Sequence, residues 1–91
     1  MPVTCELSRI DSLKTFYAQI SQGLALPAHF GHNLDALEDA LNDVPGPVVL
    51  FWHDAISARN DMGEDAFKSL TAVLHAVASE RDDFKVWIGL S

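Results

Sequence analysis

A run of five apolar residues, Val48–Trp52, constrains the fold of this chain more than any other segment. Pro45, Gly46 and Pro47 stand directly before it and end any preceding helix. The run is short and rich in β-branched and aromatic residues, which is typical of a strand. Because no polar residue alternates with the apolar ones, we expect this strand to be covered on both faces, as in a parallel sheet.

Two further segments have strand patterns. Residues 2–7 alternate apolar and polar side chains, and residues 85–90 form a last strand. Helical patterns separate the three strands, which implies parallel pairing with right-handed crossovers. The chain is therefore predicted to be an α/β protein with a single domain over residues 1–91. Its two layers would be a three-stranded parallel sheet and the helices packed against it.

Three main helices are expected from apolar residues that recur at helical spacing. Asp11 or Ser12 can cap the first helix, and Asn33 can cap the second. The segment 53–63 is expected to hold at most a short helical turn. The three predicted helices cover residues 13–24, 34–44 and 64–81.

The charge and the cysteine content exclude several classes of function. The net charge is −7, and the six basic residues are scattered, so direct binding to nucleic acid is not expected. No apolar run approaches 18 residues and no secretory signal is visible, so we expect no membrane association. The single cysteine, Cys5, cannot form an internal disulfide, and it alternates with apolar neighbours as a buried strand residue would. These features favour the cytoplasm.

Residues 34–44 predict an amphipathic helix with a strongly acidic outer side. The apolar positions are Leu34, Leu37, Leu41 and Val44. The outward positions are Asp35, Glu38, Asp39 and Asn42. Carboxylates four residues apart repel each other by roughly 0.2–0.5 kcal/mol in an isolated helix. This cost indicates a face built to meet positive charge.

The segment around this helix resembles the signature of the barstar family. The matching residues are Leu26-Pro27, Phe30-Gly31, Asn33-Leu34-Asp35-Ala36-Leu37, Asp39 and Leu41. The resemblance continues through the order of the elements and covers nearly the whole chain. It implies a barstar-like fold in which Val48–Trp52 is the central strand.

The resemblance also implies a function, which is to plug the active site of a ribonuclease. Asp39 would lie where an RNA phosphate binds, Asp35 and the preceding loop would fill the base-recognition region, and Asn33 would add polar contacts. The expected partner is a basic ribonuclease or ribonuclease-type toxin, since such an enzyme needs positive charge in its cleft. The expected partner-binding residues are His29, Phe30, Gly31, Asn33, Asp35, Glu38, Asp39 and Asn42.

The chain departs from the family pattern at three positions. The resemblance implies aromatic residues where this chain has His29, Glu38 and Val44. These differences suit a cognate enzyme with a differently shaped rim, such as one with an extra basic residue facing Glu38. They also suit the alternative, an acidic adaptor of the same fold that binds a protein other than a nuclease.

Other functions are less consistent with the residues. Asp35 and Asp39 could form a catalytic acid–base pair, but a convex helix face offers little cleft to separate their pKa values. His29 and His32 have a spacing that occurs in metal sites, yet no further His or Cys is near in sequence. We therefore expect no enzyme activity, no metal and no cofactor, and we expect a monomer. Trp52 and Trp87 are interpreted as core residues of the strands.

Overall fold

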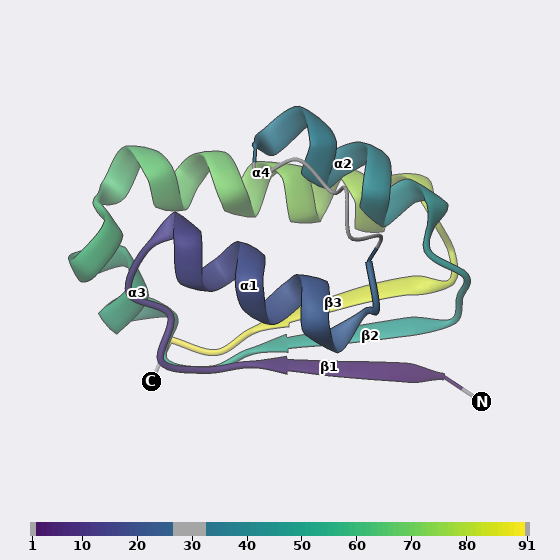
Figure 1. Ribbon diagram of the computed structural model, residues 1–91, viewed down its shortest axis with the longest axis horizontal. Coiled ribbons are helices and arrows are strands. Elements are labelled where there is room, and N and C mark those ends of the chain that lie inside the picture. Colours follow the sequence, from purple (N-terminus) through teal and green to yellow (C-terminus); the bar gives the residue numbers. More distant parts are fainter. Residues whose placement is uncertain (1, 27–32, 91) are drawn as a thin grey trace.

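The computed structural model describes residues 2–26 and 33–90, and there it has three strands and four helices (Figure 1). In chain order these are β1 (Val3–Leu7), α1 (Leu13–Gly23), α2 (Leu34–Asp43), β2 (Val48–Trp52), α3 (Ala55–Met62), α4 (Glu64–Glu80) and β3 (Phe84–Ile88). The strands form one sheet in the order β1-β2-β3, and both pairs are parallel. The predicted α/β fold and the central place of β2 are confirmed.

The helices α1, α2 and α4 lie on one face of the sheet, and α3 lies at one end of it (Figure 1). The strand order explains this arrangement. Both crossovers step across the sheet in the same direction, and right-handed crossovers that do so place their helices on the same side. The molecule therefore has the two layers that the sequence predicts, and no helix of the described residues covers the other face of the sheet.

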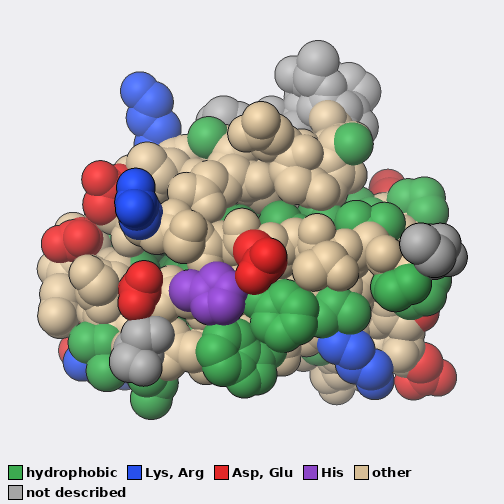
Figure 2. All heavy atoms as spheres, turned by 90° about the horizontal axis from the view of Figure 1, so that it is seen from below, with side chains coloured by type: hydrophobic (Ala, Val, Ile, Leu, Met, Phe, Trp, Pro, Cys, Tyr) green, Lys and Arg blue, Asp and Glu red, His purple; other side chains and the backbone are tan. Residues whose placement is uncertain are grey.

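The expectation that β2 is covered on both faces was wrong. Val48, Leu50 and Trp52 have no exposed surface, whereas Val49 and Phe51 alternate with them and are only partly buried. Trp87 of β3 is 50% exposed, so its assignment to the core was also wrong. Figure 2 shows this outer face of the sheet, on which hydrophobic side chains gather beside a histidine. The side chains of Phe51, His53 and Trp87 contact one another there through their rings.

The core fills the space between the helix layer and the inner face of the sheet. Trp52 lies at its centre, with ring centroids 5.2 Å from Phe16 of α1 and 5.3 Å from Phe67 of α4. Cys5 is buried in β1, as predicted. Burial raises the pKa of its thiol, which keeps it in the unreactive protonated form. An added Cβ at Gly23 would lie 2.4 Å from the Cys5 Sγ, so only glycine allows the end of α1 to pack this closely against β1.

The prediction that residues 53–63 hold at most one helical turn was also wrong, because α3 spans eight residues there. Its buried residues are Ala55 and Ala58, and such small side chains give little apolar periodicity in the sequence. The predicted helix caps are confirmed. Ser12 caps α1 in a reciprocal arrangement with Thr15, and Asn33 caps α2. In the described part of the chain, no helix combines the length and apolarity needed to span a membrane.

Candidate partner-binding surface

The helix α2 carries a concentration of negative charge. Its ten residues include four acidic side chains and no basic one, against a net charge of −7 for the whole chain. Asp35, Asp39 and Asn42 are exposed, and Glu38 is partly buried beside them. Because positions three and four apart share one side of a helix, these four residues form a single stripe, which we call the acidic stripe.

The carboxylates of the acidic stripe have no partner among the described residues. No hydrogen bond or ion pair joins Asp35, Glu38 or Asp39 to another described side chain, and the ion pairs of the described chain lie elsewhere. Three carboxylates are therefore held close together without a compensating cation from residues 2–26 or 33–90. A cation supplied from outside would relieve their mutual repulsion.

The inner side of α2 fixes the orientation of the stripe. Leu37 and Leu41 have no exposed surface, and they pack into the core opposite the acidic residues. Fully burying a leucine side chain is worth about 1.5–3 kcal/mol. A rotation of the helix that moved the stripe would expose both leucines, so packing holds the carboxylates in place.

The N-terminus of α2 is closed by Asn33. Its side-chain Oδ1 accepts a hydrogen bond of 2.8 Å from the backbone N–H of Ala36. The Oδ1 end of the Asn33 amide is therefore already used inside the protein, and the amide NH₂ group makes no hydrogen bond to a described residue. Next to this end of α2, an open depression of about 730 Å³ lies against α1. It is lined by Leu13, Lys14, Tyr17, Asn33, Leu34 and Asp35.

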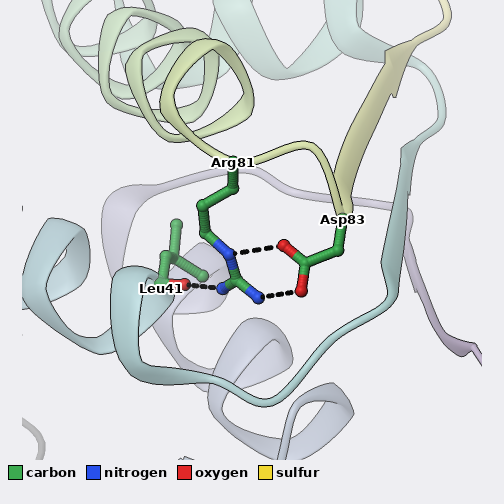
Figure 3. Close-up of polar contacts among 3 residues, drawn as sticks. All are labelled: Leu41, Arg81 and Asp83. Atoms are coloured by element: carbon green, nitrogen blue, oxygen red, sulfur yellow. Dashed lines mark hydrogen bonds and ion pairs between the residues drawn. The ribbon is translucent and has the colours of Figure 1, made fainter.

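The C-terminal end of α2 is held by Arg81, which follows α4 (Figure 3). Its Nη1 donates a hydrogen bond of 2.6 Å to the backbone carbonyl of Leu41. Its Nε and Nη2 donate to the two carboxylate oxygens of Asp83 at 2.9 and 3.0 Å. Gly46 permits this arrangement, because an added Cβ there would lie 2.1 Å from Asp83 Oδ2. The guanidinium thus joins the end of α2 to the turn before β3.

Arg81 and Asp83 are residues whose role the sequence did not reveal. The guanidinium lies beside Asp83 and holds the pKa of that carboxyl below its ordinary value. A cation at the C-terminus of a helix is also favoured by the helix dipole. Arg81 therefore acts as a positioning residue for α2. The only signal available in the sequence was a lone arginine among acidic residues after a long helix.

The predicted partner-binding residues divide into two groups. Asn33, Asp35, Glu38, Asp39 and Asn42 all lie on α2 or at its cap, within ten positions of one another. His29, Phe30 and Gly31 fall outside the described residues. Within the described residues, no group of three or more His, Cys, Asp or Glu side chains could hold a metal ion.

Comparison with known families agrees with the α/β fold. The family model described as Barstar (barnase inhibitor) matches residues 1–91, which is the whole chain. Members of this family are inhibitors rather than enzymes, and the match indicates a ribonuclease inhibitor-like role. The chain belongs to the barstar family.

Proposed function

We propose that this protein inhibits a basic ribonuclease by inserting α2 into the active site of the enzyme. Asp39 would occupy the place of an RNA phosphate and accept hydrogen bonds from the cationic groups of the cleft. A carboxylate imitates the charge of a phosphodiester but offers no bond that the enzyme can cleave. The observation that carries this proposal is a set of carboxylates with no partner among the described residues, on a helix whose orientation is fixed by packing.

Rigidity is as important to this proposal as charge. A partner that orders flexible groups on binding loses affinity through the lost conformational freedom. Here the N-terminal cap at Asn33 and the hydrogen bond from Arg81 hold both ends of α2 before any partner arrives. Binding then needs little further ordering of the helix. Charge-assisted hydrogen bonds to arginine would give Asp39 the largest share of the interaction.

The neighbouring residues would extend the contact along the cleft. Asp35 lies one turn before Asp39, at the edge of the depression beside α1, and would face the base-recognition region. Asn33 would use its free amide NH₂ group as a donor. Glu38 and Asn42 would contact the rim, where Glu38 requires a basic residue on the enzyme. His29, Phe30 and Gly31, which precede α2, are proposed to complete the surface.

The biological role that follows is that of an antidote or immunity protein for a nuclease made by the same cell or a relative. Charge complementarity accelerates the encounter of two proteins, which suits the rapid capture of a toxic enzyme. The excess of negative charge on α2 would steer a positive cleft toward this helix rather than toward the other faces of the protein.

A titration of RNA cleavage tests this function. A basic ribonuclease, such as one encoded beside this gene, is mixed with increasing amounts of the protein, and the cleavage of a short RNA is followed. We expect inhibition that is stoichiometric and that the RNA substrate relieves by competition. An unchanged cleavage rate despite binding would contradict inhibition at the active site. Binding restricted to a protein without nuclease activity would instead identify an adaptor.

A further inference from the structure

The strand β3 is an edge of the sheet, and within the described residues it pairs only with β2. The N–H of Gly89 donates a hydrogen bond to the carbonyl of Trp52, and the carbonyl of Asp83 accepts one from the N–H of Val48. Lys85 and Trp87 occupy the alternate positions between Asp83 and Gly89. Their backbone N–H and C=O groups therefore also point toward β2. By alternation, the N–H and C=O groups of Val86 and Ile88 point outward from the sheet.

This edge is also the apolar one. The side chains of Val86 and Ile88 are only partly buried beneath the helix layer, and Trp87 is 50% exposed on the outer face. On the opposite edge, β1, Cys5 and Leu7 are already buried, and Val3 at the start of the strand is 39% exposed. A strand added at β3 would therefore remove more apolar surface from water than one added at β1. An uncovered edge of this kind invites the pairing of another strand.

We propose that β3 pairs with β3 of a second copy of this protein, antiparallel, about a two-fold axis at Trp87. In this register Val86 lies opposite Ile88 of the second copy, and the reverse pair follows from symmetry. Both residues have outward backbone groups, so each of the two pairs forms two hydrogen bonds. The partly buried side chains of Val86 and Ile88 also meet across the pair, and each covers the exposed part of the other.

The outer face of the pair fits the same register. The two Trp87 residues become directly opposite neighbours at a position without mutual hydrogen bonds, where side chains approach most closely. Each indole already lies along its own strand against Gly89, since an added Cβ there would be 2.4 Å from the ring. Gly89 in turn lies opposite Lys85 of the second copy. The lysine therefore passes beside the indole, in reach of a cation–π contact.

The charge of the edge favours a second copy over a basic protein. The residues of β3 include Lys85 and no acidic side chain, so the negative charge that marks α2 is missing here. The strand β3 therefore offers a basic nuclease no carboxylate to bind. Two copies place each lysine against an aromatic ring and bring no carboxylates together along β3.

The size of the edge sets the strength of the association. A five-residue strand offers less contact than the roughly 800 Å² per partner found in stable complexes. We therefore expect a weak dimer with a dissociation constant of about 10 μM or higher. The monomer that the sequence predicts would predominate in dilute solution. The proposed contact runs along β3, whereas the acidic stripe lies on α2 in the helix layer (Figure 1).

Sedimentation velocity tests this pairing over a range from about 5 μM to about 500 μM protein. The unmodified protein should shift toward the dimer mass as its concentration rises. Far-ultraviolet circular dichroism should show an exciton couplet from the Trp87 pair that grows with concentration. A Val86→Pro variant removes the outward N–H and keeps the hydrogen bonds to β2, so it should weaken the association at least tenfold.

A matched control is Thr4→Pro, because the N–H of Thr4 points outward from the β1 edge in the same way. This variant should associate like the unmodified protein. If Val86→Pro does not fold, Trp87→Ala replaces it and should abolish the couplet and weaken the association. A constant monomer mass over the whole range would overturn the proposal. Undiminished association of the folded β3 variants, or equal weakening by Thr4→Pro, would also overturn it.

Discussion

Arg81 donates a hydrogen bond of 2.6 Å to the carbonyl of Leu41, and this contact joins residues 40 positions apart in the sequence. Leu41 belongs to the last turn of α2, where backbone carbonyls have no partner inside the helix. The same guanidinium is fixed by Asp83 on its other side and lies 5.7 Å from the ring centroid of Phe84. The acidic helix is thus attached to the turn between α4 and β3.

Replacement of this arginine should loosen the end of α2. Arg81→Met keeps much of the side-chain volume but removes the donors to Leu41 and Asp83. A hydrogen bond that involves a charged group contributes roughly 1.5–3 kcal/mol. We expect the free energy of unfolding to fall by about the contribution of one such bond. Urea denaturation measures it. Arg59→Met on α3 is the matched control and should change the stability little. Equal effects of the two substitutions would contradict the positioning role of Arg81.

The Arg81–Asp83 pair predicts how stability depends on pH. Arg81 lowers the pKa of Asp83 from its ordinary value of 3.8, chiefly through the hydrogen bonds to its side chain. The unfolded chain therefore binds the proton more readily, and the stabilisation is fully present above pH 3.8 and lost as the pH falls through the lowered value. The stability difference between the unmodified protein and Asp83→Asn should narrow over this acidic range in urea titrations. A constant difference would contradict the assignment.

The cap at the start of α2 can be tested separately. Asn33→Ala removes the acceptor for the Ala36 N–H and should lower the free energy of unfolding by about 1 kcal/mol. Asn33→Asp keeps an acceptor and adds a charge that the helix dipole favours, so it should be at least as stable as the unmodified protein. Thermal unfolding of the three proteins gives the comparison. If Asn33→Ala unfolded at the same temperature as the unmodified protein, the cap at Asn33 would contribute nothing to stability.

Salt should slow association with the nuclease more than it speeds dissociation. Exposed charges on α2 steer the encounter, and such steering is screened over about 10 Å at 0.1 M salt. Stopped-flow mixing at increasing salt concentrations should show a falling association rate constant with a nearly constant dissociation rate constant. An association rate that is insensitive to salt would contradict electrostatic steering by the acidic stripe.

The sequence predicted α2 and the sheet because local and long-range requirements agree there. Leu37 and Leu41 at helical spacing, a capping asparagine before them and a Pro-Gly-Pro turn after them leave one interpretation of the segment. The resemblance to the barstar family then placed partner-binding roles on the same helix. The roles themselves stay predictions, and those of His29, Phe30 and Gly31 concern residues outside the described part of the chain.

The errors arise where the outcome depends on distant parts of the chain. The apolar run of β2 does not indicate whether helices cover one face of the sheet or both, because the strand order decides it. The helix α3 buries only alanines, so its pattern is weak. The contact between Arg81 and Leu41 depends on how two helices pack, and no local pattern in the sequence predicts such a contact.

The most direct test of the proposed function is the inhibition constant of an Asp39→Asn variant against the cognate ribonuclease. This substitution keeps the shape of the side chain and removes its charge. Removing one partner of a buried charge pair costs about 2–5 kcal/mol of binding free energy, a range that rests partly on barnase with barstar itself. The inhibition constant should therefore rise by roughly 30-fold or more. Asp61→Asn on α3 makes the same change in net charge and should inhibit like the unmodified protein. Equal inhibition by Asp39→Asn and the unmodified protein would contradict the phosphate-mimic role of Asp39.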